Sequence, residues 1–455
     1  MSETPPPSRP VAAVILAAGQ GTRMASDRPK VLHEIAGAPL LHHAMRAALA
    51  LEPERLAVVV GHGAGEVGDA ARALAPEAAV CLQAEQKGTG HAVLAAAEAL
   101  AGFGGDLVVL FGDTPLLRPE TLARLAKARE AGADVVVLGF EAADPGRYGR
   151  LVLGAGGRLE RIVEARDATQ AELALATCNS GVLAGDCAML LRLLGRCRPD
   201  NAQGEIYLTD VVGLATAEGL AAQAVLCDEA ETLGVNDRAQ LAAAEAAFQD
   251  RARAAAMAGG ATLVAPETVF LAHDTMLGRD VVVEPHVVFA TGVTVADGAT
   301  IRAFSHLEGA EVGPGCVVGP YARLRPGTRL AAAARIGNFV EVKNAEIGAG
   351  AKANHLSYVG DATVGAEANL GAGTITCNYD GVSKHRTEIG ARAFVGVNAA
   401  LVAPVSIGEG AYVATGTVVT RDVPADALAI ARTGQTNREG SAARLREKLG
   451  AKKTR

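Results

Sequence analysis

The chain has 455 residues, of which 49% are hydrophobic and 20% are charged, and its formal net charge is −7. This length favours two domains, and the composition allows each of them to bury a core of its own. The charge excludes a surface that is basic throughout and binds nucleic acid or an anionic membrane, and no apolar run reaches the ~18–20 residues that cross a bilayer.

The N-terminal segment 1–10 is rich in proline and lacks the charged and then apolar pattern of a signal peptide, so we expect a disordered leader. From residue 11 to about 223, short apolar runs alternate with helical stretches, and we place the first domain at 11–236. This rhythm predicts an α/β domain with a mostly parallel sheet that is covered on both faces and binds ligands beyond the carboxyl ends of its strands. We expect strands at 11–16, 56–60, 107–111 and 135–140, and helices at 42–50, 92–100 and 119–131.

Residues 237–258 form one Ala-rich stretch with Leu241, Glu245 and Phe248 at helical spacing, followed by Gly259-Gly260 as a stop. We expect a connecting helix of roughly 33 Å at the usual rise per residue.

The period changes in the C-terminal domain, which we place at 259–455. From Val283 onwards an apolar residue recurs at every sixth position, with one slip after Leu307. Such a repeat fits neither a helix nor an amphipathic strand, and it predicts a parallel β-helix of hexapeptide repeats with about eight turns. The polar break at 376–388 indicates a protruding loop. The period leaves the handedness open, and it also leaves open that this rod is only a scaffold.

A Gly-rich turn, Leu16-Ala-Ala-Gly-Gln-Gly-Thr-Arg-Met24, follows the first predicted strand. Small residues allow backbone N–H groups to approach a phosphate, and Arg23 and Lys30 add positive charge. The spacing is neither that of a Walker A loop nor that of GxGxxG. An ordinary connection between a strand and a helix is the alternative.

Asp113 follows the buried strand predicted at 107–111, in the sequence Phe111-Gly-Asp-Thr-Pro115. A carboxylate at this place can hold Mg²⁺, which takes few protein oxygens and completes its shell with phosphates and water. The alternative is that Asp113 caps the helix predicted near Pro119.

The order of motifs in the first half resembles that of the sugar-nucleotide pyrophosphorylases. The shared motifs are LAAGQGTRM, Pro29-Lys30, Gln83–His91, Gly112-Asp113, Tyr148–Arg150, Ile162–Glu164, Asn179–Gly181 and Gly234–Asn236. The second half is similar to the acetyltransferase half of one bifunctional family, which combines N-acetylglucosamine-1-phosphate uridylyltransferase with glucosamine-1-phosphate acetyltransferase. Its motifs here are Arg323–Gly327, Gly337–Lys343, His355–Tyr358 and Asn369–Gly381.

This resemblance implies a Rossmann-like nucleotidyltransferase domain, a left-handed β-helix, a homotrimer, and UDP-N-acetylglucosamine as a product for bacterial envelope synthesis. It implies that Arg23 and Lys30 are catalytic, that Asp113 and Asn236 hold Mg²⁺, and that UTP and acetyl-CoA are co-substrates. Residues expected at UTP and the sugar nucleotide are Leu16, Ala17, Ala18, Gly19, Lys30, Gln83, Gly88, Thr89, Gly112, Asp113, Gly149, Glu164, Asn179 and Asn236. In this set Gln83, Gly88 and Thr89 would read the uracil, and Gly149, Glu164 and Asn179 would hold the sugar.

His355 is the expected base of the acetyltransferase, because an attacking amine must lose a proton and imidazole titrates near neutral pH. His62 and His91 are assigned no proton transfer. The resemblance implies Arg325, Lys343, Tyr358 and Asn369 at the sugar phosphate, and it implies Ala372, Asn378, Tyr379, Val397, Thr415 and Arg432 at acetyl-CoA. Val397 and Thr415 depart from the family, which usually has Ser and Ala there, and this puts two cofactor contacts in doubt.

Two other functions remain open: a single-activity nucleotidyltransferase with a structural β-helix, and a regulatory subunit without activity. His355 with Asn378 and Tyr379 argues against the first, and Arg23, Lys30, Asp113 and Asn236 argue against the second. The seven scattered cysteines lack a CxxC pair, which favours reduced thiols and the cytoplasm. We expect no partner other than small molecules and further copies of the chain.

Overall fold

The computed structural model describes residues 9–453, and the chain divides into two compact units between Ala252 and Arg253. Most of the expected leader, residues 1–8, lies outside the described residues. Its last residue, Pro10, is ordered against the sheet, since its carbonyl accepts a hydrogen bond of 2.8 Å from the backbone N–H of Asp106. Within the described part, no helix has the length and apolarity needed to cross a membrane.

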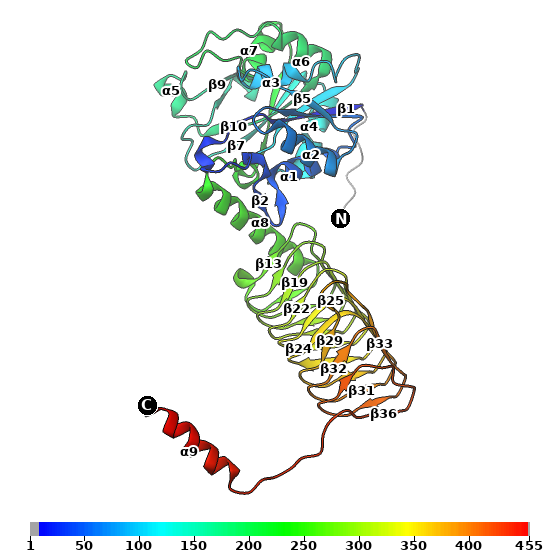
Figure 1. The fold of residues 1–455 in the computed structure, drawn as a ribbon. Coiled ribbons are helices and arrows are strands. Elements are labelled where there is room, and N and C mark those ends of the chain that lie inside the picture. Colours follow the sequence, from blue (N-terminus) through cyan, green and yellow to red (C-terminus); the bar gives the residue numbers. More distant parts are fainter. Residues whose placement is uncertain (1–8, 454–455) are drawn as a thin grey trace. The chain divides into compact units, whose positions relative to one another are not determined.

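The first unit is built on a nine-stranded sheet whose main path runs β11-β7-β10-β6-β1-β4-β5 (Figure 1). Its strands are β1 (Val11–Ala17), β4 (Arg55–Val60), β5 (Ala79–Leu82), β6 (Asp106–Phe111), β7 (Val135–Glu141), β8 (Arg150–Leu153), β9 (Leu159–Val163), β10 (Thr177–Asp186) and β11 (Ala222–Cys227). A separate hairpin pairs β2 (Glu34–Ile35) with β3 (Ala38–Pro39). Neighbours β6, β1, β4 and β5 are parallel, which confirms the expected mostly parallel α/β sheet. Strand β10 was not expected, and it runs antiparallel to both β6 and β7.

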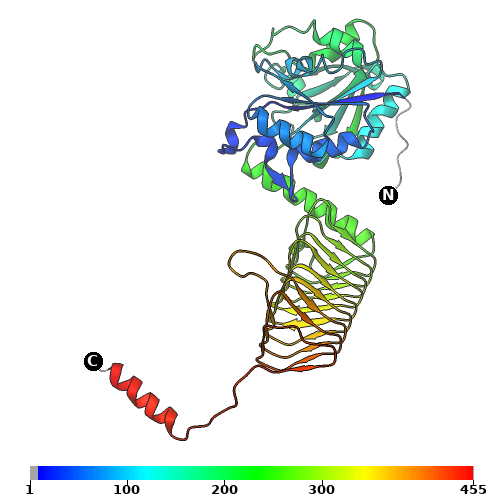
Figure 2. The same ribbon diagram turned by 45° about the vertical axis from the view of Figure 1, so that its right-hand side comes forward.

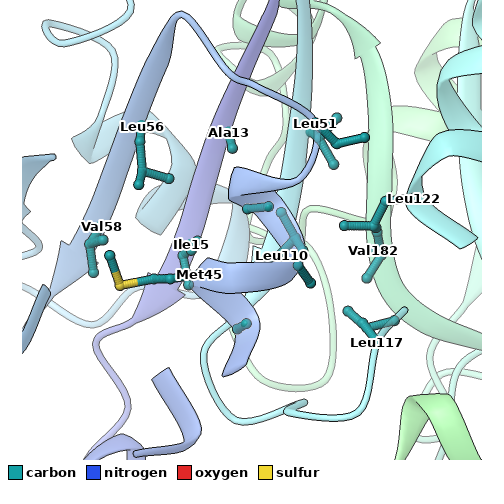
Figure 3. Close-up of a cluster of buried hydrophobic side chains, with 14 of the residues drawn as sticks. Ala13, Ile15, Met45, Leu51, Leu56, Val58, Leu110, Leu117, Leu122 and Val182 are labelled. Atoms are coloured by element: carbon teal, nitrogen blue, oxygen red, sulfur yellow. The ribbon is translucent and has the colours of Figure 1, made fainter. Parts of the chain in front are cut away.

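Helices cover both faces of this sheet. They are α1 (Leu40–Leu49), α2 (Ala64–Leu74), α3 (Thr89–Ala95), α4 (Pro119–Glu130), α5 (Gln170–Leu173), α6 (Cys187–Leu194) and α7 (Asp210–Ala217). On one face, Ile15 and Leu110 of the sheet lie in a fully buried cluster with Met45 of α1 (Figure 3). Helix α3 ends earlier than expected, because from Ala96 onwards the chain continues as turns in which N–H groups such as those of Ala96 and Ala97 bond the carbonyl three residues before.

The connecting helix α8 spans Arg238–Ala258. Its first half packs on the first unit through Ala244, which is buried with Met24 and Leu116. The carboxylate of Glu245 accepts a hydrogen bond of 2.7 Å from the backbone N–H of Ala36, and this contact holds the β2–β3 hairpin against the helix.

The second unit is a parallel β-helix in which short strands stack into three faces. The first face contains β12 (Thr262–Leu263), β15 (Val282–Val283), β18 (Thr300–Ile301), β21 (Val317–Val318), β24 (Arg335–Asn338), β26 (Lys352–His355), β28 (Asn369–Leu370), β31 (Phe394–Val395), β34 (Tyr412–Val413) and β36 (Leu428–Ala429). The second contains β13 (Phe270–Leu271), β16 (Val288–Phe289), β19 (His306–Leu307), β22 (Arg323–Leu324), β25 (Glu341–Ile347), β27 (Tyr358–Val364), β29 (Ile375–Cys377), β32 (Ala400–Val402) and β35 (Val418–Val419). The third contains β14 (Met276–Leu277), β17 (Thr294–Val295), β20 (Ala310–Val312), β23 (Thr328–Leu330), the later parts of β25 and β27, β30 (Thr387–Ile389) and β33 (Val405–Ile407).

The apolar residues of the six-residue period are buried, from Val283 to Val419, and this burial confirms the β-helix that the period predicts. The structure extends the coils at both ends, from Thr262 to Ala429. The first coil was not predicted, because the short turn Pro266–Thr268 interrupts the six-residue period of apolar residues there.

A loop leaves the coils after β29 (Figure 2). It is shorter than the expected 376–388, because β29 continues to Cys377 and β30 resumes at Thr387. Beyond the coils, a last helix, α9, spans Ser441–Lys453.

Candidate active sites

Lys30, Asp113 and Asn236 come from three segments of the first unit and meet at one point. The ammonium group of Lys30 donates a hydrogen bond to the carboxylate of Asp113 and a second one, of 3.1 Å, to Oδ1 of Asn236. The backbone N–H of Val235 donates to the carbonyl of Asp113 at 2.9 Å and joins two of these segments. The alternative that Asp113 caps α4 is wrong, since that helix begins after Arg118 and has no side-chain cap.

This convergence fits a cation, because the oxygens of Asp113 and Asn236 already share the positively charged Nζ of Lys30 as a partner. Between residues 9 and 453, no group of three or more His, Cys, Asp or Glu side chains is placed to hold a metal ion. A divalent ion here would therefore take most of its ligands from phosphates and water, as Mg²⁺ commonly does.

A cavity of about 260 Å³ opens beside this cluster, at the carboxyl ends of β1 and β6. The side-chain amide of Gln83 donates to the carbonyl of Gly88 at 3.1 Å and lies 3.1 Å from Nδ1 of His91. Gly88 has φ +102°, and a Cβ there would lie 2.6 Å from the carbonyl oxygen of Ile206, so only glycine fits. The cavity is lined by Leu16, Ala17, Ala18, Gly19, Lys30, Val31, Gln83, Gln86, Gly88, Thr89, Ala92, Phe111, Asp113 and Glu205.

Sequence reasoning missed Gln86 in this cavity. Its side-chain amide donates a hydrogen bond of 2.6 Å to the carbonyl of Ala18, so it shapes the Gly-rich turn. Gly112 contacts the start of the same turn, because its N–H donates a hydrogen bond of 2.9 Å to the carbonyl of Leu16.

A larger cavity of about 790 Å³ adjoins the first, and the two share Phe111 and Asp113. Arg23 opens into the larger cavity, whereas Lys30 lines the smaller one. The larger cavity is lined by Arg23, Phe111, Asp113, Thr114, Arg147, Tyr148, Arg166, Ser180, Gln203, Thr232, Gly234, Asn236 and Gln240. Arg147, Arg166 and Gln203 belong to no motif, so no pattern in the sequence points to them.

The expected sugar ligands lie together beside this cavity. The N–H of Asn179 donates to the carbonyl of Gly149 at 2.8 Å, and a Cβ on Gly149 would lie 3.4 Å from the carboxylate of Glu164. That carboxylate accepts a hydrogen bond of 3.2 Å from the hydroxyl of Thr209. Burial raises the pKa of Glu164, and the nearby Asp167 and Asp210 add to the effect. Asn179 reaches this position through a bulge of β10 between Asn179 and Leu183.

In the β-helix, His355 begins a column of exposed and half-buried residues along one corner. Its Nδ1 lies 2.7 Å from Oδ1 of Asn338, one coil earlier. Backbone hydrogen bonds then join each coil to the one before it. The N–H groups of Gly373, Asn398 and Gly416 donate to the carbonyls of His355, Ala372 and Val397, respectively. The guanidinium of Arg432 donates to the carbonyl of Thr415 at 2.9 Å and closes the column. His355, Ala372, Val397 and Thr415 therefore lie in one row.

Arg325, Lys343, Tyr358 and Asn378 form a second group, on the second face. The amide of Asn378 donates to the hydroxyl of Tyr358 at 3.5 Å and also contacts the carboxylate of Asp361. The guanidinium of Arg325 donates to Glu341 at 2.7 Å, and this hydrogen bond raises the pKa of Arg325.

Lys384 joins this group, although no prediction included it. Its ammonium group lies beside that of Lys343 and lowers the pKa of Lys343. Tyr379, in the same loop, donates its hydroxyl proton to the carbonyl of Gly381 at 2.6 Å. Asn369 lies apart from this group, on the first face between Lys352 and Phe394.

The comparisons with known proteins agree with this division. Residues 13–182 match the MobA-like NTP transferase domain. The chain is 63% identical to the bifunctional protein GlmU of Ruegeria sp. (strain TM1040), with 97% of this chain and 98% of the relative covered. It is 60% identical to the GlmU protein of Dinoroseobacter shibae over 98% of both chains, and 59% identical to that of Xanthobacter autotrophicus over 96% of this chain and 98% of the relative.

The fold and the two groups of residues define a nucleotidyltransferase domain that is followed by a hexapeptide-repeat β-helix. The chain belongs to the family of the bifunctional GlmU proteins. This membership confirms the expectation of a bifunctional enzyme with a uridylyltransferase half and an acetyltransferase half.

Proposed function

We propose that the two halves make UDP-N-acetylglucosamine in sequence, with acetyl transfer first. The amine of glucosamine-1-phosphate attacks the thioester carbon of acetyl-CoA. The C–N bond forms, the C–S bond breaks, and the amine proton passes to Nε2 of His355. The observation that carries this step is the bond between Asn338 and Nδ1 of His355, because Nδ1 then holds the hydrogen and Nε2 keeps a free lone pair.

The column that starts at His355 supports an assignment for acetyl-CoA. Its thioester end would lie at the histidine, and the rest would follow Ala372, Val397 and Thr415 toward Arg432. Arg325, Lys343 and Tyr358 would hold the sugar phosphate, and Asn378 and Tyr379 would contact the coenzyme. A guanidinium and an ammonium group supply the positive charge that a phosphate needs.

In the first unit, a phosphate oxygen of N-acetylglucosamine-1-phosphate attacks the α-phosphorus of UTP, and pyrophosphate leaves. The smaller cavity would take the uridine, with Gln83, Gly88 and Thr89 at the base, and Glu164 and Asn179 would hold the sugar. Arg23 and Lys30 balance the charge of the phosphates, since such reactions depend on positioning and electrostatics. Asp113 and Asn236 would hold Mg²⁺, which when bound neutralises phosphate charge.

We further propose a homotrimer in the cytoplasm, with domains at 11–236, 237–258 and 259–455. One chain places Asn369 on a different face from Tyr358, and from this we infer that a neighbouring copy completes the acetyl site. The flat stacked faces of a β-helix suit packing around a threefold axis. All seven cysteines carry free thiols, as is usual in a reducing compartment.

A reciprocal pair of variants tests this division in the full chain. His355→Ala should lower acetyl transfer about 100-fold or more, the scale for losing a general base, and leave uridylyl transfer intact. Asp113→Ala should abolish uridylyl transfer and leave acetyl transfer intact. Both activities are measured on each preparation together with a melting curve. If either variant lowered both activities equally with an unchanged melting temperature, the proposal of two independent sites would fail.

A further inference from the structure

Asn344, Asp361 and Asn378 form a polar ladder across three successive coils of the β-helix. The carboxylate of Asp361 accepts a hydrogen bond of 2.6 Å from the amide of Asn344, and its other oxygen accepts one from the amide of Asn378. Asp361 is only 9% exposed. Burying a charged carboxylate costs free energy unless it is hydrogen-bonded and lies near positive charge. The groups around Asp361 therefore indicate its role.

The positive charge comes from two lysines. Lys343 lies on β25, Lys384 lies in the loop after β29, and their ammonium groups are close enough to repel each other. Lys384 lowers the pKa of Lys343, the nearby Arg325 lowers it further, and Asp361 opposes both. Burial alone would raise the pKa of Asp361, but the two amides and the two lysines outweigh burial and hold its pKa below the usual range. The carboxylate therefore stays charged beside the lysine pair.

We propose that Asp361 is a positioning residue of the acetyl-transfer site: it fixes the side chain of Asn378 and places a negative charge near Lys343 and Lys384, which would bind the sugar phosphate. This inference rests on the proposed function, because it gives Asn378 and Lys343 their roles. Asp361 itself touches neither substrate. It acts on the coenzyme side through Asn378 and on the phosphate side through the lysines.

The backbone conformation of Asp361 allows its replacement by Asn. Asp361 has φ +48°, in the left-handed region that Asp and Asn adopt more readily than other residues. Asp361→Asn thus keeps size and backbone preference, and it removes the charge together with one of the two oxygens that accept from Asn344 and Asn378. Glu346→Gln is the matched control, because Glu346 is an exposed carboxylate on the same strand as Lys343 and faces the third side of the β-helix.

The measurement is kcat/KM for glucosamine-1-phosphate as a function of pH, in the full chain with saturating acetyl-CoA. For Asp361→Asn we expect a loss of about 10-fold or more, the scale of a hydrogen bond to a charged group. We also expect the alkaline limb of the profile to move to lower pH, because Lys343 loses its proton more easily without the carboxylate. Glu346→Gln should keep the wild-type profile.

The outcomes separate the inference from the function on which it rests. Absence of acetyl transfer in the wild type would refute the proposed function. An active wild type with an unshifted alkaline limb in Asp361→Asn would refute the inference alone, even if the rate fell, because lost packing does not move a limb. Uridylyl transfer and a melting curve check each preparation.

If Asp361→Asn does not fold, Asn344→Ala gives the second test. It removes one donor to Asp361 and keeps the charge, so we expect kcat/KM to fall several-fold with the alkaline limb in place. Wild-type kinetics in a folded Asn344→Ala variant would overturn the role of the ladder.

Discussion

The imidazole of His355 faces the amide of Asn338 across one step of the β-helix, with Nδ1 2.7 Å from Oδ1. The amide oxygen can only accept, so it selects the imidazole form whose Nε2 accepts a proton.

Replacing this acceptor should weaken the base without removing it. Asn338→Ala should lower kcat of acetyl transfer about 10-fold or more, a part of what a general base contributes. Asn338→Asp keeps an oxygen opposite Nδ1 and should retain most of the activity. Steady-state rates of both variants check this, and equal losses in the two would argue against a role for the acceptor.

The raised pKa of Glu164 predicts that the stability of the folded protein depends on pH. Because burial raises its pKa, the folded protein holds the proton more tightly than the unfolded chain does, and the free energy of unfolding falls as pH rises above the ordinary pKa of 4.5. Glu164→Gln should therefore raise the melting temperature near pH 7, and the gain should disappear below pH ~4.5. Melting curves of both proteins across this range test it. A gain that is equal at all pH values would show that the charge is not the cause.

We expect Val397 to weaken the binding of acetyl-CoA. It lies between Ala372 and Thr415 in the column that starts at His355, and its side chain can make no hydrogen bond. Val397→Ser should lower KM for acetyl-CoA about 2- to 10-fold, which is the value of one hydrogen bond. Val418→Ser makes the same change at an exposed position of the second face and should leave KM unchanged. An unaltered KM in Val397→Ser would remove Val397 from the coenzyme path.

The assembly is tested by mass measurement in solution, which should show three copies of the chain. His286, Phe304, Tyr321 and Phe339 form an exposed stack along one corner, with adjacent ring centroids 4.8–5.1 Å apart. Exposed apolar surface of this kind favours association. A stable monomer with full acetyltransferase activity would contradict the trimer.

The sequence predicted most of the β-helix because its signal is local: each residue of the six-residue period turns inward whatever its neighbours are. Val283 and Val413 were found in this way, whereas Leu263 was missed because an inserted turn follows it. Strand β10 was missed because its middle, Asn179-Ser-Gly181, is polar and lies next to a bulge, and thus lacks a strand pattern.

The sites follow the same division. Residues within motifs, such as Lys30 and Asp113, could be found from sequence order, and the structure brings them together with Asn236. Sequence order could not identify Arg147, Lys384 and Asp361. Their neighbours come from distant coils or loops, and the spacing of residues along the chain does not predict such contacts.

The loop after Cys377 shows how this architecture can change. It lengthens the path between two stacked strands, yet Leu370 still lies in register with Val395 on the first face. The frame thus tolerates insertions at its corners without any loss of alignment. In evolutionary terms, such corners are places where new acceptor specificity can arise from added residues, while the inherited coils, and with them the position of His355, stay as they were.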